Sequence, residues 1–62
     1  MSKITITDII VTKQIKKENS VIFHQKSNEV IKESNLNRFR ENKINDFVGD
    51  VNVYFIYKQN NN

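Results

Sequence analysis

The sequence predicts a small α+β domain in which one helix packs against a three-stranded antiparallel sheet. Residues 51–58 alternate apolar and polar side chains in the manner of a half-buried strand. Two further segments, 3–12 and 21–26, are rich in β-branched residues, and residues 35–48 carry apolar side chains at helical spacing. The predicted order along the chain is therefore strand, strand, helix, strand.

The last predicted strand, residues 51–58, gives the clearest signal. Its side chains alternate between two faces, one with Val51, Val53, Phe55 and Tyr57 and the other with Asn52, Tyr54, Ile56 and Lys58. Because period two is the spacing of a strand that buries one face, the first set is expected to point to the core. The second set includes Tyr54 and Ile56, so the outer face is expected to carry apolar surface.

The first predicted strand, residues 3–12, begins as an alternation of isoleucine and threonine and loses this pattern at residues 9–11, Ile-Ile-Val. Two interpretations are open. A β-bulge near Thr7-Asp8 exchanges the inward face, or the strand lies mid-sheet with one face on the helix and the other under a partner subunit. We favour the second, because the last strand also has two apolar faces.

Residues 13–20 are predicted to form the loop between the first two strands. They are polar and contain no glycine, which favours a loop longer than a two-residue turn, with Asn19 in the left-handed position. The second strand opens at residues 21–26. Residues 27–33 are interpreted as irregular chain or as an extension of this strand.

The helix is predicted at residues 35–48, with Ser34 or Asn35 as its N-cap. Its apolar stripe consists of Leu36, Phe39, Ile44, Phe47 and Val48. Gly49 follows where a left-handed residue commonly ends a helix. A competing interpretation makes residues 48–51 a tight hairpin turn.

Connection rules give the strand order 2-1-3, with antiparallel neighbours and a right-handed crossover. The helix is expected to cover one sheet face through Leu36, Phe39, Ile44 and Phe47. The other face is expected to expose Tyr54, Ile56 and part of residues 9–11. Residues 1–58 are predicted to form one domain, followed by a disordered polar tail at 59–62.

Composition excludes several classes of protein. A single domain of 62 residues is expected to gain stability from self-association or from unusually close packing. With no cysteine and one histidine, disulfides and thiolate zinc sites are excluded and no metal or cofactor is expected.

The net charge of +3 makes the protein mildly basic. No apolar run reaches the ~20 residues of a membrane span and no signal-peptide core is seen, so a cytoplasmic protein without membrane contact is expected.

No group of residues predicts catalysis. The sequence places no carboxylate or nucleophile beside His24, which is therefore interpreted as a surface histidine. Asp46 and Asp50 flank Gly49 but supply fewer oxygens than a calcium loop, and they are interpreted as solvated turn residues. We expect a protein that is not an enzyme.

Arg40 interrupts the apolar stripe of the helix. Its stem can cover apolar surface with the guanidinium in water, or the guanidinium can pair with an acidic group of a partner. Exposed apolar patches mark interaction surfaces, so the residues predicted to contact a protein partner are Arg40, Tyr54, Ile56, Ile9 and Val11. The alternative partner is nucleic acid, for which the predicted residues are Lys13, Lys16, Lys17, Arg38 and Lys43.

Residues 44–58 combine a helix end that carries Asp46, Phe47 and Gly49 with an alternating strand that carries Val51, Val53 and Phe55. This arrangement resembles the C-terminal half of the small prophage proteins called YonK. There a helix ends with an acidic residue, phenylalanine, one residue and glycine, and an alternating strand follows. The resemblance covers about a quarter of the chain. It implies a phage-borne, oligomer-forming protein without catalytic residues.

Together these observations predict a homo-oligomeric accessory protein of a phage or mobile element. Such a protein binds a host macromolecular complex and inhibits or redirects it, in the manner of an anti-CRISPR protein acting on a defence nuclease. The alternative is a small basic protein that binds nucleic acid through its lysine-rich hairpin and helix.

Overall fold

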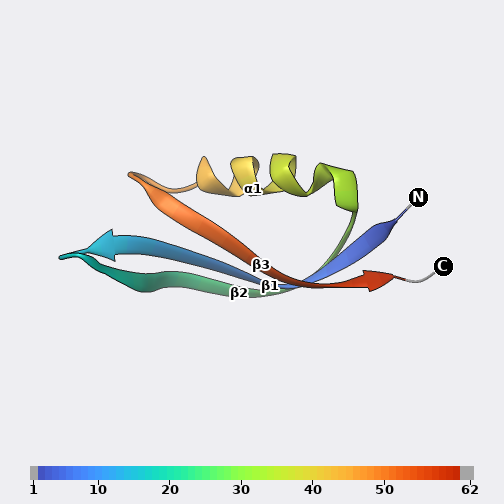
Figure 1. Cartoon of the computed structure of the whole chain (residues 1–62), viewed down its shortest axis with the longest axis horizontal. Helices are drawn as coiled ribbons and strands as arrows, with labels where there is room; N and C mark the ends of the chain where they lie inside the picture. Colours follow the sequence, from blue (N-terminus) through green and yellow to red (C-terminus); the bar gives the residue numbers. More distant parts are fainter. Residues whose placement is uncertain (1, 61–62) are drawn as a thin grey trace.

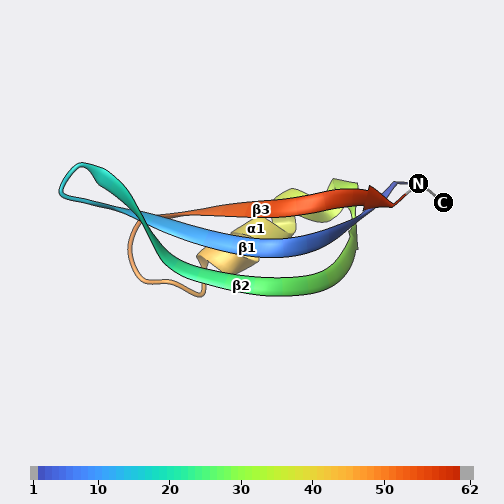
Figure 2. The same ribbon diagram turned by 90° about the horizontal axis from the view of Figure 1, so that it is seen from below.

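The computed structural model describes residues 2–60 and confirms the predicted order of elements (Figure 1). These elements are β1 (Lys3–Ile15), β2 (Glu18–Lys32), the 3₁₀ turn η1 (Glu33–Asn35), α1 (Leu36–Ile44) and β3 (Val51–Asn60). The strands form one antiparallel sheet in the order β2-β1-β3, as predicted. The helix α1 lies across one face of this sheet. Figure 2 views the opposite face, with the strands in front of the helix.

The strands are longer than the sequence predicts, because pairing extends beyond the alternating segments. The segment 27–32 continues β2, which confirms the strand-extending interpretation up to η1. Gln59 and Asn60 were expected in a disordered tail, yet they continue β3 and pair with β1. The Thr5 hydroxyl donates a hydrogen bond to Oδ1 of Asn60 at 3.0 Å. Residues 61–62 lie outside the described part of the chain.

The β1–β2 connection is a two-residue turn, so the prediction of a longer loop with Asn19 in the left-handed position was wrong. Ile15 pairs directly with Glu18. The two residues between them, Lys16 and Lys17, have φ angles of 52° and 69°. Positive φ at both central residues is typical of a type I′ turn, in which Asn-Gly is preferred. The long ladder fixes where the chain reverses, and this outweighs the local preference of lysine.

The strain of this turn gives a prediction. The double substitution Lys16→Asn/Lys17→Gly is expected to raise the free energy of unfolding by about 1–2 kcal/mol, because an ordinary residue pays about that much for a left-handed conformation. Urea denaturation followed by circular dichroism measures the gain. Lys16→Gln/Lys17→Gln removes the same charges without easing φ, and it is expected to leave stability unchanged. An equal gain in both variants would assign the effect to charge repulsion.

A β-bulge at Thr7 sets the buried face of β1. Ile6 pairs with Tyr57 and Asp8 pairs with Ile56, so Thr7 is an extra residue relative to β3. One extra residue moves the following side chains to the opposite face. The inward side chains of β1 are therefore Ile4, Ile6, Ile9 and Val11, all nearly or fully buried. The bulge interpretation is confirmed. β1 also lies mid-sheet, as the other interpretation expected, and the cover of its second face by a partner subunit stays a prediction.

The core lies between α1 and the sheet. Its buried residues are Ile4, Ile6, Ile9, Val11, Val51 and Val53. Leu36, Phe39, Ile44 and Phe47 pack on them, as predicted, together with Ile31 and Phe55. Phe39 contacts Phe55 and Phe47 contacts Phe23, each with 5.4 Å between ring centroids. Such aromatic pairs add stabilisation beyond their buried area.

The helix α1 is shorter than predicted and ends at Ile44. The chain then passes through turns and bends, so Val48 is 92% exposed and does not belong to the apolar stripe. Asn35 occupies the N-cap position without a side-chain capping bond, because η1 precedes the helix directly. Gly49 has the expected positive φ of 91°, although it lies beyond the helix end. The alternative hairpin turn at 48–51 is not formed, since β3 pairs with β1.

Candidate binding face

The sheet face opposite α1, here called the open face, is not covered by any described element (Figures 1 and 2). Strand pairing assigns its side chains, because directly paired residues point to the same side of a sheet. In one row Ile10 lies between His24 and Tyr54, and in the next Asp8 lies between Lys26 and Ile56. The pairing and alternation extend the face to Lys3, Thr5, Thr12, Val21, Val30, Lys32, Asn52, Lys58 and Asn60.

Apolar side chains are exposed on the open face. Tyr54 and Ile56 are 53% and 52% exposed, as expected from the alternation of β3. Ile9 and Val11, which were assigned to the same interaction surface, are 3% and 0% exposed under α1. That assignment was wrong, because the bulge turns both side chains inward. Ile10, which was not singled out, occupies the open face between the two outer strands.

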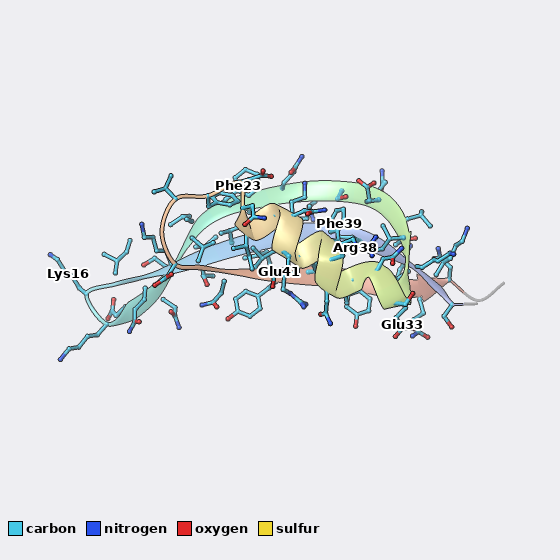
Figure 3. All side chains as sticks on the ribbon, turned by 90° about the horizontal axis from the view of Figure 1, so that it is seen from above. Lys16, Phe23, Glu33, Arg38, Phe39 and Glu41 are labelled. Carbon is cyan, nitrogen blue, oxygen red and sulfur yellow. The ribbon has the colours of Figure 1, made fainter. Side chains whose placement is uncertain are left out.

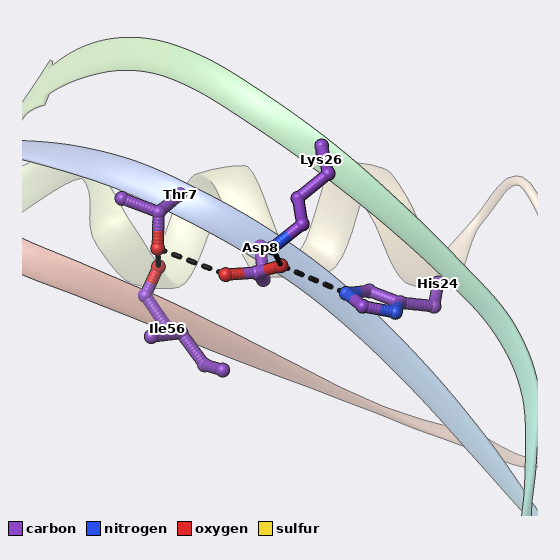
Figure 4. A network of polar contacts seen from close by, with 5 residues as sticks. All are labelled: Thr7, Asp8, His24, Lys26 and Ile56. Carbon is purple, nitrogen blue, oxygen red and sulfur yellow. Dashed lines mark hydrogen bonds and ion pairs between the residues drawn. The ribbon is translucent and has the colours of Figure 1, made fainter.

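A polar network centred on Asp8 lies in the middle of this face (Figure 4). Oδ1 of Asp8 is 2.8 Å from both His24 Nε2 and Lys26 Nζ. Oδ2 accepts a hydrogen bond from the Thr7 hydroxyl at 3.0 Å. That hydroxyl is also 3.1 Å from the carbonyl oxygen of Ile56, and its single proton can serve only one acceptor at a time. The sequence did not reveal the partner of His24, because the strand register brings it together with Asp8.

The network does not have the geometry of a catalytic triad. The Thr7 hydroxyl meets the carboxylate instead of the imidazole, so no base is in place to activate it. Hydrogen bonds from Lys26 and then from His24 lower the pKa of Asp8 from 3.8 to about 2, against an opposing effect of burial. A carboxylate with so low a pKa is a poor general base. The network instead fixes Lys26 and His24 on the open face.

The ionisation of Asp8 predicts a specific response to acid. Because the pKa is lower in the folded protein, ionised Asp8 stabilises the fold above the ordinary pKa of 3.8, and this contribution is lost as pH falls toward 2. The melting temperature of the wild type is expected to drop over this interval more steeply than that of Asp8→Asn. Asp50→Asn, which removes an exposed loop carboxylate, is expected to follow the wild-type slope. Parallel slopes in all three proteins would contradict the prediction.

Arg40 lies on the α1 side of the sheet and is bonded within its own chain. Its Nε donates to the carbonyl oxygen of Val53 at 3.2 Å, and Nη1 donates to Oδ1 of Asn37 at 2.9 Å. The guanidinium carbon is 5.5 Å from the ring centroid of Phe55. Its stem covers apolar surface, but its head group is held by β3, which is an edge strand. Arg40 therefore shields part of a sheet edge.

The contacts of Arg40 predict its role in stability. Arg40→Ala is expected to lower the free energy of unfolding by about 1–3 kcal/mol, since it removes two charged hydrogen bonds and a cation–π contact. Arg38→Ala, at an exposed position of the same helix, is expected to change it by less than about 0.5 kcal/mol. Thermal and urea denaturation of both variants measure the difference. Equally small effects of both substitutions would show that the contacts of Arg40 do not stabilise the fold.

The basic residues predicted to bind nucleic acid do not form one surface. Lys16 and Lys17 lie at the tip of the β1–β2 hairpin, far from Arg38 on α1 (Figure 3). Lys13 points to the helix side, where Gly49 lies close to its Nζ. The ammonium of Lys43 lies 5.3 Å from the ring centroid of Phe39. Two of these residues therefore lie at the hairpin tip, and the other three lie on the helix side of the sheet.

Positive charge collects instead on the open face. Four lysines lie there, and the one acidic residue among the face residues is Asp8, which is already paired with Lys26. The lysines of the open face are Lys3, Lys26, Lys32 and Lys58. The rest of the chain carries six basic and six acidic residues, so the whole net charge of +3 belongs to the open face. Alternation in the strands, corrected for the bulge, could have revealed this segregation.

Other kinds of site find little support in the described residues. A shallow hollow is lined by Ser2, Lys32, Glu33 and Ser34, and its carboxylate lies 3.4 Å from the side-chain nitrogen of Gln59. Within residues 2–60 no three metal-binding side chains cluster, and α1 is far too short and polar to cross a bilayer.

Comparisons with protein-family models, with curated proteins and with solved structures found no match. The resemblance to YonK stays a prediction.

Proposed function

We propose that this chain is a non-catalytic binding protein that docks its open face onto a negatively charged surface of another macromolecule. The observation that carries the proposal is the meeting of four lysines with exposed apolar side chains on one uncovered sheet face. Charge steers the encounter, and the apolar residues supply contact area once water is displaced.

The partner that we propose is a host macromolecular complex, such as a defence nuclease, inhibited or redirected by a phage or mobile-element protein in the host cytoplasm. The sign of the charge limits how such a protein can act. A mimic of nucleic acid needs a negatively charged surface, whereas the open face has an excess of lysine. Inhibition would therefore come from covering a negatively charged part of the complex.

The expected homo-oligomer fits the open face poorly. Two copies that met through this face would each bring a formal charge of +3, and like charges across an interface oppose association. A foreign partner of opposite charge is the better occupant. Sedimentation at low salt is expected to find a monomer, and a dimer that persists at low salt but dissociates on Lys58→Glu would contradict this assignment.

Affinity capture with paired variants tests the proposed function. Tyr54→Asp/Ile56→Asp places two charges on the open face, and Asn42→Asp/Asn45→Asp places two on the helix side. Host macromolecules retained by the wild type are expected to be retained by the helix variant and lost by the open-face variant, with circular dichroism confirming that both are folded. If all three proteins retain the same set, or none, the open face is not the docking surface.

A further inference from the structure

We propose that the open face binds single-stranded nucleic acid, with bases stacked on Tyr54 and His24 and phosphates held by Lys3, Lys32 and Lys58. This inference rests on the proposed function, since it names the chemistry recognised by the same face. The nucleic acid can be free or can be the exposed strand of a host nucleoprotein complex. Two independent features of the open face support it.

The first feature is a row of side chains suited to bases. Tyr54 and His24 flank Ile10 across the three strands, so their backbones are about 10 Å apart. Tyr54 is 53% exposed, and the imidazole of His24 is held by the carboxylate of Asp8 at 2.8 Å. Aromatic rings on an open sheet stack on any base, because every base has a π-face. The separation suits two bases of one strand, with Ile10 as apolar surface between the rings and Ile56 in the next row.

The second feature is a cross-strand pair of like charges. Lys3 lies directly opposite Lys32 on the open face, and Lys58 lies in the next row beside Thr5. Two ammonium groups at paired positions repel each other and destabilise a sheet. A phosphate between them removes this repulsion and gains two charged hydrogen bonds. Lys26 is occupied by Asp8 at 2.8 Å, so the phosphate site lies at the Lys3–Lys32 end of the face.

The exposed rings and apolar side chains of the open face favour a single strand over a duplex. A duplex presents phosphates outward and keeps its bases stacked inside, so Tyr54, Ile10 and Ile56 would gain no contact from it. An extended single strand can run along the face, with the phosphates of one stretch at the lysine end and the bases of another stretch at the Tyr54–His24 row. A negatively charged protein surface would use the lysines but has no special need for the two rings.

Tyrosine fluorescence tests the stacking directly. The chain has two tyrosines and no tryptophan, so in Tyr57→Phe the emission comes from Tyr54 alone. An oligothymidylate or oligouridylate of about 12 nucleotides is expected to quench this emission on binding. The matched variant Tyr54→Phe leaves Tyr57, which points to the other face, and its emission is expected to stay unchanged. Equal quenching in both variants would overturn the stacking arrangement.

Charge and salt test the phosphate site. Lys32→Gln/Lys58→Gln is expected to weaken binding of the same labelled oligonucleotide about 10-fold or more at ~50 mM salt, and to reduce the slope of log K against log salt by about 1.4. Arg38→Gln/Lys43→Gln has the same net charge but keeps the open face, and its affinity is expected to match the wild type. Equal losses of affinity in the two variants would show that the oligonucleotide is attracted by the net positive charge of the protein and not by the open face. This result would overturn the proposal.

The two proposals can fail separately. If no oligonucleotide binds at low salt while Tyr54→Asp/Ile56→Asp still abolishes capture of a host protein, the proposed function stands and the partner is a negatively charged protein surface. If oligonucleotides bind and nuclease treatment of the lysate releases the captured material, nucleic acid is the direct partner. If neither oligonucleotide nor host macromolecule depends on the open face, both proposals are wrong.

Discussion

Ile9→Ala is expected to lower the free energy of unfolding by about 2–5 kcal/mol, whereas Ile10→Ala, one residue further along, is expected to cost less than about 1 kcal/mol. Ile9 is 3% exposed beneath α1, and Ile10 is half-buried on the open face. A domain of 62 residues has a total stability of roughly 3–9 kcal/mol, so the first variant would be at the limit of folding. Urea denaturation followed by circular dichroism gives both values.

This pair of variants also tests whether a partner covers the second face of β1. The residues are adjacent and chemically identical, so propensity and side-chain entropy largely cancel in the comparison. Large losses at both positions would mean that both faces are covered, and hence that a second copy lies on the open face. A large loss at Ile9 alone supports the bulge and an uncovered face.

Deletion of Thr7 is expected to abolish cooperative folding. Without the extra residue, either Ile4 and Ile6 or Ile9 and Val11 would have to turn to the open face, because side chains alternate strictly in a regular strand. Each alternative removes two nearly fully buried side chains from the core, a loss comparable to the total stability. Far-UV circular dichroism and a thermal melt detect the result.

Thr7→Gly is the control for this deletion. It keeps the additional residue and removes the side chain, including the hydroxyl that reaches Asp8 and Ile56. It is expected to fold with a lower melting temperature. A deletion variant that melts like the wild type would show that β1 can slip in register without loss, and the assignment of side chains to the two faces would then fail.

The sequence was sufficient for the elements and their order. The alternation at 51–58 and the stripe of Leu36, Phe39, Ile44 and Phe47 are local patterns. The period of such a pattern indicates directly whether a segment is a strand or a helix. The two interpretations of residues 9–11 could not be separated in this way. A bulge and a strand with two covered faces leave the same local pattern, and the difference lies in pairing with β3, more than forty residues away.

The candidate site was harder to predict for the same reason. His24 meets Asp8, and Lys3 meets Lys32, through the register of a hairpin whose turn chemistry suggested a longer loop. Arg40 was singled out correctly as unusual, but its partners Val53 and Phe55 belong to its own chain. Grouping charges by strand face instead of by sequence distance would have found the open face.

The central place of β1 has a consequence for how the chain folds. The first strand in sequence pairs along its length with the last, so that Lys3 faces Asn60. The sheet thus has a high contact order, which is typical of domains that fold in milliseconds to seconds. While the chain leaves the ribosome, a hairpin of β1 and β2 would display Ile4, Ile6 and Val11 with nothing to cover them. During that interval the nascent protein would be a natural client for chaperones that bind exposed apolar strands.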